Sequence, residues 1–416
     1  MFTLLLHFDG LESDLLLLLL NSVKSEESER IRDYDYLLAG GGAAGLSLLY
    51  HLLQEPRLAD KRILLIEPER KDQNDRTWSF WADAPMPFDS IVAHEWAQLA
   101  FRSPGFEQVF PLRRHQYKMI RGLDFYRYVK AAVAGAPQVT WVTGTVERLE
   151  EATGGVVAHT SAGTFSARYA FDSRPPQLQK RPDKHRYLLQ HFVGWEIQTE
   201  QDVFDPETVE FMDFRGEQQQ EARFMYVLPF SKRRALVEYT LFSAEMLPKA
   251  AYEAEIRAYL RELGVEKYQI EAEEIGAIPM TDHPLPARQS PHIINIGTRG
   301  GRAKPSTGYA FKRIQQQSAR LVAALAATGQ PPQDPTGDQW QFRLFDTLLL
   351  DAMQRCGEQT RHIFAQLFQR NPVERIFDFL DERTTPWENL QVMNSVSPWP
   401  FLRSIWQVLR GKPGQR

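Results

Sequence analysis

Residues 34–67 read YDYLLAGGGAAGLSLLYHLLQEPRLADKRILLIE, and this stretch decides the fold. The apolar run Tyr34–Ala39 has the length of a buried strand and leads directly into three glycines. From Ala43 to Leu53, apolar residues recur at three-and-four spacing, which predicts a helix. Ile63–Ile66 is a second apolar run of strand length. The stretch therefore predicts a βαβ unit.

The glycines of this unit match the dinucleotide-binding pattern G-x-G-x-x-G. Gly40 permits a tight turn, Gly42 lets the backbone approach a pyrophosphate, and Gly45 lets the helix pack closely on the strand. Glu67 ends the second strand, where a carboxylate can accept hydrogen bonds from ribose hydroxyls. The alternative is that the glycines only shape a turn, but strand, helix and acid in this order favour a dinucleotide site. The pattern alone does not choose between NAD and FAD.

A second glycine-rich loop follows another apolar run late in the chain. His292–Ile296 predicts a strand, and residues 297–309, beginning at Gly297, read GTRGGRAKPSTGY. We expect a helix from about Thr307 to Ala327, so that backbone N–H groups and the helix dipole face an anionic group. The alternative is an ordinary capped helix.

Between the two glycine loops the pattern predicts short elements and then a β-rich unit. Residues 74–111 are irregular and aromatic-rich, and a loop of this length in a compact domain favours a functional role. The other expected elements are a helix at 124–134, a strand at 139–147, a hairpin at 155–171, three strands between 192 and 242, an amphipathic helix at 249–263 and helices within 339–409.

These elements predict an α/β protein of several units. The first is a Rossmann-like dinucleotide-binding domain into which a β-sheet substrate domain is inserted, and a helical region follows at the C-terminus. The expected bounds are a disordered extension at 1–32, the dinucleotide-binding domain at 33–175 and 270–330, the substrate-binding domain at 176–269 with a contribution from the loop 74–111, and the helical region at 338–416.

Composition narrows the partners. The net charge of −4 provides no positive field for nucleic acid, so we expect no nucleic-acid partner. The single cysteine, Cys356, excludes an intramolecular disulfide and fits a reducing cytoplasm. The ten histidines show no H-E-x-x-H spacing, and we expect no metal site. The sequence leaves the oligomeric state open.

No run of about 20 apolar residues occurs, so the sequence predicts no transmembrane helix. Leu15–Leu20 is a short apolar run that lacks the positive flank of a secretory signal. The tail at 399–412, WPFLRSIWQVLRGK, mixes tryptophan, leucine and basic residues as an interfacial membrane helix does. The alternative for this tail is a helix docked on the core.

Several segments in family order resemble the bacterial lycopene β-cyclases, most closely the branch found in Bacteroidetes-like bacteria. The resemblance covers about residues 33–330, with weaker similarity at FDFLD, residues 377–381. Many relatives carry two adjacent acids in one strand motif, which reads VEYT here, so that Glu238 is followed by Tyr239. The matching segments are YDYLLAGGGAAGLSLLYHLL, QNDRTWSFW, YKMIRGLDFY, FDSRPP, HFVGWE, FMDF, FMYVLPFS, VEYTLFS, GAIPM and IGTRGGRAKPSTGYAFKRIQ.

The resemblance implies an aromatic-hydroxylase-like fold with FAD in its reduced form as cofactor and NAD(P)H as the reductant. It implies an isomerase that cyclises lycopene and related acyclic carotenoids. Because carotenoids reside in the bilayer, the enzyme is expected in the cytoplasm, attached peripherally to the inner membrane. Thr307 and Gly308 are expected near the isoalloxazine edge and Arg174 near the flavin, although a structural ion pair is the alternative for Arg174.

Cyclisation of such an end group requires an acid, a stabiliser of the cation and a base. Alternation in the strand Arg234–Phe242 places Leu236, Glu238 and Thr240 on one face. If that face lines an apolar cavity, desolvation raises the pKa of Glu238 and keeps it protonated as the catalytic acid. The alternative is a surface or salt-bridged glutamate.

Other residues are candidates for the same site. Trp78, Phe80 and Trp81 can present ring faces to a carbocation, and core packing is the alternative for each. Asp213 is a second acid on a predicted strand, suited to orienting Glu238 or to taking the ring proton.

Two rival functions remain open, because fold does not fix chemistry. One is a flavin monooxygenase or isoprenoid reductase, which consumes NAD(P)H in proportion to product. The other is a non-catalytic flavin- or carotenoid-binding membrane protein, whose function would survive Glu238→Ala.

Overall fold

The computed structural model describes residues 33–176 and 185–409, and the expected extension at 1–32 lies outside this part of the chain. The stretch that opens the described chain forms the predicted βαβ unit. It consists of β1 (Tyr34–Ala39), α2 (Ala43–Leu53) and β2 (Ile63–Glu67). The two strands are parallel neighbours, and α2 is the crossover between them.

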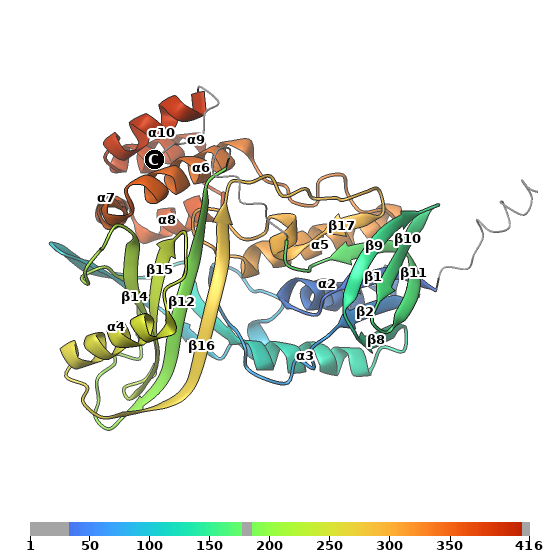
Figure 1. Ribbon diagram of the computed structural model, residues 1–416, viewed down its shortest axis with the longest axis horizontal. Helices are drawn as coiled ribbons and strands as arrows, with labels where there is room; N and C mark the ends of the chain where they lie inside the picture. Colours follow the sequence, from blue (N-terminus) through green and yellow to red (C-terminus); the bar gives the residue numbers. More distant parts are fainter. Residues whose placement is uncertain (1–32, 177–184, 410–416) are drawn as a thin grey trace, which may run out of the picture.

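These strands belong to a seven-stranded, mostly parallel sheet on the right of Figure 1. β1 lies between β2 and β11, parallel to both, and Leu37 and Leu38 on its two faces are fully buried. A strand covered on both faces carries an unbroken apolar run, as this one does. Further elements of the layer are β8 (Val139–Thr143), β9 (Val146–Ala152), β10 (Gly155–Thr160), β11 (Gly163–Asp172), β17 (Ile293–Asn295), α3 (Gly122–Ala134) and α5 (Phe311–Thr328).

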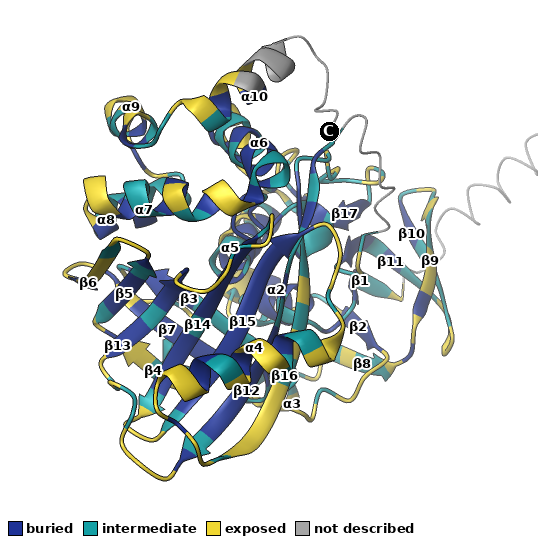
Figure 2. Cartoon of the chain, turned by 60° about the vertical axis from the view of Figure 1, so that its left-hand side comes forward, coloured by how far each residue is buried: buried dark blue, intermediate teal, exposed yellow. Residues whose placement is uncertain are grey.

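The second sheet is mainly antiparallel and runs in the order β16-β12-β15-β14-β13-β5-β6. One face packs against α4 (Lys249–Glu262), which lies across the sheet in Figure 2. The other face packs its aromatic residues against the C-terminal helices. The strands are β5 (Gln98–Ser103), β6 (Phe106–Pro111), β12 (Tyr187–Thr199), β13 (Thr208–Asp213), β14 (Ala222–Ser231), β15 (Arg234–Ser243) and β16 (Tyr268–Thr281).

Residues 74–111 are not the irregular loop that their sequence suggests. They contain four short strands, of which β5 and β6 form the edge of the second sheet. The other two, β3 (Thr77–Ala82) and β4 (His94–Trp96), both pair with β7 (Gln116–Arg121) in a third, small sheet. Short strands that pair with distant partners give little periodic signal, which explains the error.

Two further element assignments need correction. The strand expected at 139–147 is two strands, β8 and β9, that lie at different positions in the first sheet. The region 192–242 holds four strands rather than three, because β12 and β13 are separate. The boundary drawn between residues 269 and 270 falls inside β16, which pairs with β12 over its whole length.

The C-terminal helices cover the second sheet at the upper left of Figure 1. Phe377 of this unit stacks on Trp81 of β3, with ring centroids 4.6 Å apart, and so joins the helices to the small third sheet. Within the described residues, no helix combines the length and apolarity needed to cross a membrane. The helices are α6 (Trp340–Arg355), α7 (Thr360–Arg370), α8 (Val373–Leu380), α9 (Pro386–Ser395) and α10 (Trp399–Leu409).

Candidate active site

The loop after β1 forms a cradle at the N-terminus of α2. Gly40 has a φ of +102°, which favours glycine. A Cβ atom at Gly45 would lie 1.9 Å from the carbonyl oxygen of Gly40, so no side chain fits there. A Cβ atom at Gly42 would meet nothing within 4 Å, so this position opens on free space. The cradle thus offers backbone N–H groups and the positive end of a helix dipole to an anionic ligand.

Glu67 lies beside this loop, and its carboxylate turns back onto it. Oε2 accepts a hydrogen bond from the N–H of Gly41 at 2.5 Å, and Oε1 accepts one from the N–H of Glu69 at 3.1 Å. The side chain is buried. Glu67 therefore fixes the shape of the cradle, and its contact with a ribose stays a prediction.

The second glycine loop packs against the first. Gly297, at φ +61°, opens a short 3-10 helix (Gly297–Gly300), and a Cβ atom there would lie 2.5 Å from the Cβ of Ala44 in α2. The helix that we expected from Thr307 begins only at Phe311. Gly308, at φ +73°, is in a left-handed conformation that an α-helix excludes, which explains the later start.

A cavity of about 690 Å³ joins the glycine loops to the second sheet. This volume is in the range of small-molecule sites. From the first unit and its loops it is lined by Ala43, Ser173, Thr298, Thr307 and Gly308, and from the second sheet by Gln190, Phe192, Phe211, Phe224, Tyr226, Leu236, Glu238, Thr240 and Phe242. Thr307 Oγ1 is buried and has no hydrogen-bond partner among the described residues.

Glu238 lies in β15 on the face that lines the cavity, together with Leu236 and Thr240, as the alternation of the strand predicts. Its side chain is 6% exposed, and within the described chain no group donates a hydrogen bond to it. Burial raises the pKa of Glu238 well above its ordinary value, and the nearby carboxylate of Glu274 raises it further. The structure thus excludes the surface or salt-bridged alternative for this residue.

Glu274 is a cavity residue that the sequence analysis missed. It lies in β16, and its Oε1 accepts a hydrogen bond from the backbone N–H of Thr77 at 2.9 Å. Burial raises its pKa, whereas the bond from Thr77 and the charge of Arg76 lower it. The signal was hidden because Glu274 follows three other acids in a strand whose preceding residues are exposed.

Three buried tyrosines add hydroxyl groups near Glu238. The hydroxyl of Tyr117 lies 2.8 Å from that of Tyr226 and 3.0 Å from that of Tyr309. All three residues line the cavity. Burial raises the pKa of each phenol well above its ordinary value, so all three stay neutral at physiological pH.

Of the three aromatic residues predicted for the substrate pocket, the cavity contacts only Trp78. Phe80 stacks on Phe311 in the core of the first unit, with centroids 5.0 Å apart. Trp81 stacks on Phe377 and is buried among the C-terminal helices. The assignment of Phe80 and Trp81 to the pocket is therefore corrected: successive residues of β3 point to opposite faces, and both side chains are taken up by packing.

Asp213 and Arg174 are each held in an ion pair. Asp213 accepts hydrogen bonds from Nε and Nη2 of Arg215 at 2.9 and 2.6 Å, does not line the cavity, and is not brought together with Glu238. A β-bulge between Glu210 and Asp213 shifts the register and explains this placement. Arg174 donates to both oxygens of Asp172 and does not line the cavity, so the structure favours the ion-pair alternative.

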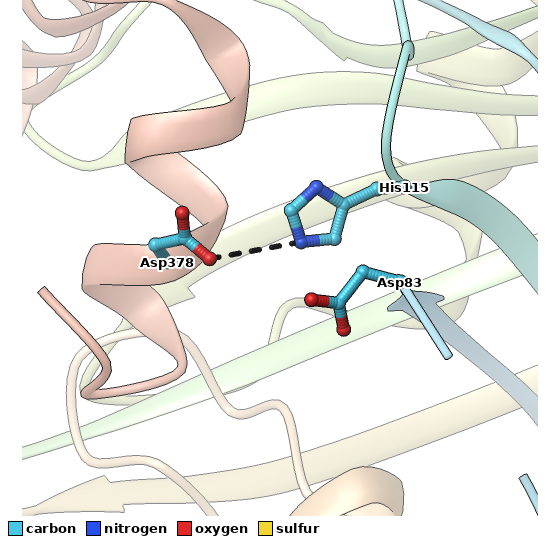
Figure 3. Close-up of side chains that lie close together, drawn as sticks. All are labelled: Asp83, His115 and Asp378. Atoms are coloured by element: carbon cyan, nitrogen blue, oxygen red, sulfur yellow. Dashed lines mark ion pairs between the residues drawn. The ribbon is translucent and has the colours of Figure 1, made fainter. Parts of the chain in front are cut away.

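Figure 3 shows Asp83, His115 and Asp378, whose ligand atoms lie within 4.8 Å of one another. Arg383 occupies the same region: its guanidinium donates to Asp83 at 2.7 Å and to Asp378 at 2.8 Å. The two carboxylates are therefore already neutralised. This network ties the end of β3 to α8, and we assign it a structural role.

A family model for the lycopene cyclase protein matches residues 35–405. The lycopene β-cyclase of Pseudescherichia vulneris is 26% identical over 402 residues, which cover 92% of this chain and 99% of that protein. The lycopene β-cyclase of Paracoccus sp. (strain N81106 / MBIC 01143) is 29% identical over 392 residues, which cover 89% and 96%.

Solved structures resemble this chain in fold. A geranylgeranyl bacteriochlorophyll reductase-like protein from Thermoplasma acidophilum aligns with a TM-score of 0.56 at 15% identity, covering 91% of this chain and 98% of its own. The p-nitrophenol 4-monooxygenase of Pseudomonas putida DLL-E4 aligns at 0.55 and 14%, covering 92% and 99%. The halogenase PltM in complex with FAD aligns at 0.55 and 12%, covering 84% and 82%. The predicted aromatic-hydroxylase-like fold is thus confirmed.

Proposed function

The chain belongs to the lycopene cyclase family, and on that premise we propose that it is a lycopene β-cyclase. The reaction closes the ψ-end groups of lycopene to β-ionone rings, giving γ-carotene and then β-carotene without net redox change. The observation that carries this proposal is Glu238, a buried carboxyl group with a raised pKa in an aromatic cavity. An acid of this kind is needed to protonate a carbon–carbon double bond.

The cavity suits a hydrocarbon substrate. Phe192, Phe224 and Phe242 of the second sheet give it apolar walls, so shape and apolar contact position the substrate. Glu238 stays protonated at neutral pH because burial disfavours its charged form. The ring face of Trp78 stabilises positive charge that develops on the substrate.

The residues around the glycine loops fit FAD. Gly42 opens on free space where a pyrophosphate would lie, and the unpartnered Oγ1 of Thr307 faces the same cavity. We propose that Gly40, Gly42 and Gly45 hold the pyrophosphate, with Glu67 at the ribose and Gly297, Thr307 and Gly308 beside the ring system. The reduced cofactor, maintained by NAD(P)H, supplies electron density to a cationic reaction centre. The family resemblance carries this oxidation state.

We also propose peripheral attachment to the cytoplasmic face of the inner membrane. The helix α10 buries Phe401 and Ser404 and exposes Trp399, Leu402 and Ile405. This spacing places the three exposed apolar residues on one face. The helix is therefore docked on the core through one side and offers an apolar side outward, so it combines the two alternatives considered for the tail.

Pigment analysis tests the function. Bacteria that accumulate lycopene would express the wild-type chain, the variant Glu238→Gln and the control Glu245→Gln, which changes an exposed glutamate just after β15. We expect γ- or β-carotene with the wild type and the control, and unconverted lycopene with Glu238→Gln. Persistent lycopene with soluble, flavin-loaded wild-type protein would refute the proposal.

The same purified protein separates the rival functions on this fold. A cyclase consumes NAD(P)H only to reduce its flavin, so reductant use stays far below product formation over many turnovers. A monooxygenase or isoprenoid reductase consumes one equivalent per product. A non-catalytic carotenoid-binding protein would retain its function after Glu238→Ala.

A further inference from the structure

Two carboxyl groups of the cavity lie on either side of one glycine. Gly194 of β12 is paired with Glu238 of β15 on one side and with Glu274 of β16 on the other. Residues directly opposite each other in antiparallel strands point to the same face of the sheet. Both glutamates therefore point to the face that lines the cavity.

The missing side chain at Gly194 makes room for this arrangement. A Cβ atom there would lie 2.6 Å from Cγ of Glu238 and 3.1 Å from its Oε1. The side chain of Glu238 thus lies over Gly194, toward the strand that carries Glu274. The two groups also interact electrostatically, since the charge of Glu274 raises the pKa of Glu238.

The surroundings of the two carboxyl groups differ. Glu274 accepts a hydrogen bond from the backbone N–H of Thr77, and the positive charge of Arg76 also favours its ionised form. In the described chain, Glu238 has no comparable donor. One proton shared by the pair therefore resides on Glu238, and Glu274 carries the negative charge. Such a division is how two nearby carboxyl groups take on acid and base roles.

We propose that Glu238 and Glu274 form an acid–base pair across Gly194, in which Glu238 protonates the substrate and Glu274 removes the ring proton. This inference rests on the proposed cyclase function. The Glu238 proton forms a C–H bond at the terminal double bond, and the electrons of the internal double bond close the ring. A ring C–H bond then breaks, its electron pair forms the new double bond, and its proton passes to Glu274. A proton transfer from Glu274 to Glu238 restores the pair, so no oxidant or reductant is consumed.

The test compares Glu274→Gln with wild type and with the matched control Glu273→Gln. Glu273 is the preceding residue of β16 and points to the opposite face, where it pairs with Lys249. Glutamine at 274 can still accept the hydrogen bond from Thr77. We expect Glu274→Gln to lower turnover about 100-fold or more while keeping its flavin. The control should stay within about twofold of wild type.

The pH profile of turnover gives a readout that a structural role would not change. Wild type should show a bell, in which the acidic limb reports ionised Glu274 and the basic limb reports protonated Glu238. The residual activity of Glu274→Gln should lack the acidic limb, whereas Glu274→Asp should keep it. The other ionisable groups that face the pair are Asp75 and Arg76 before β3, Tyr117 of β7, Tyr226 of β14 and Tyr309.

The outcomes separate this inference from the function on which it rests. Wild-type turnover by Glu274→Gln, or an unchanged acidic limb in that variant, overturns the pair and leaves the cyclase assignment intact. If Glu274→Gln does not fold, loss of the acidic limb in Glu274→Asp overturns the pair instead. Absence of cyclic product from flavin-loaded wild type overturns both.

Discussion

At the scale of single residues, the burial of Glu238 links catalysis to stability. Burial holds the pKa of this carboxyl group above its ordinary value of 4.5, so the folded state favours the protonated form. Stability from this group is full below about pH 4.5 and is lost as the pH rises toward the raised pKa, because the unfolded chain releases the proton first. Activity and stability therefore place opposite demands on this position.

The variant Glu238→Gln removes this pH-dependent cost. Its melting temperature should exceed that of wild type by a margin that grows with pH above about 4.5, by up to about 1.4 kcal/mol per pH unit. Thermal unfolding of both proteins from about pH 5 to about pH 8 measures the margin. The exposed Glu245→Gln serves as control and should show a flat difference. A margin for Glu238→Gln that is equally flat would contradict the buried, protonated state.

Gly194 provides a second residue-scale prediction. A methyl group in Gly194→Ala would come within 2.6 Å of Cγ of Glu238, so the glutamate must move away from the strand that carries Glu274. We expect turnover to fall about 10-fold or more with flavin content unchanged, because a misplaced acid transfers its proton poorly. Gly216→Ala is the matched control, since a Cβ atom there meets nothing within 4 Å. Equal turnover in both alanine variants would show that the position of Glu238 is not constrained by Gly194.

At the scale of elements, a buried ion pair fastens the second glycine loop to the C-terminal unit. Lys304 follows this loop, and its Nζ lies 3.1 Å from Asp346 of α6 and 3.2 Å from Glu382. Ser306 donates to the same aspartate at 2.6 Å. Burial raises the pKa of Asp346, and the charge of Lys304 opposes that shift. The helices thus help to position the loop that we propose beside the flavin.

Asp346→Ala tests this link. Removing one partner of a buried ion pair costs about 3–5 kcal/mol, so we expect a lower melting temperature. Because the loop would be less well fixed, flavin should also dissociate more readily, which fluorescence of released flavin measures. Glu358→Ala, at an exposed acid of the same C-terminal unit, should change neither quantity. Tight flavin retention by a destabilised Asp346→Ala would separate the loop from cofactor binding.

Elements also show how far the sequence could predict this molecule. The βαβ unit follows from local periodicity and glycine spacing, and the structure confirms it. Glu238 was found because alternation and the family motif act within one strand. Glu274 was missed because only pairing through Gly194, 80 residues away, brings it to Glu238. The strands at 74–111 were missed for the same reason, since their partners are non-local.

At the scale of the whole molecule, the C-terminal unit concentrates exposed apolar side chains. Trp387 and Leu390 of α9 and Trp399, Leu402 and Ile405 of α10 are exposed. Both helices lie at the top of Figure 2, at the opposite end from the loops below α4. Exposed tryptophan and leucine on one helix face are typical of proteins that sit at a membrane surface. A lipid-soluble substrate requires such a contact.

The double variant Trp399→Ser/Leu402→Ser should therefore weaken membrane binding without disturbing the active site. Co-sedimentation with vesicles of phosphatidylethanolamine and phosphatidylglycerol measures binding, and we expect a loss of about 10-fold or more, because two large apolar side chains no longer enter the interface. Ile270→Ser, at an exposed apolar residue of β16, is the control and should bind as wild type does. Turnover of lycopene dispersed in detergent should be unchanged, whereas turnover of lycopene in vesicles should fall with binding. If both kinds of turnover fell together, α10 would contribute to the fold rather than to substrate delivery, and the membrane contact would have to lie on another face.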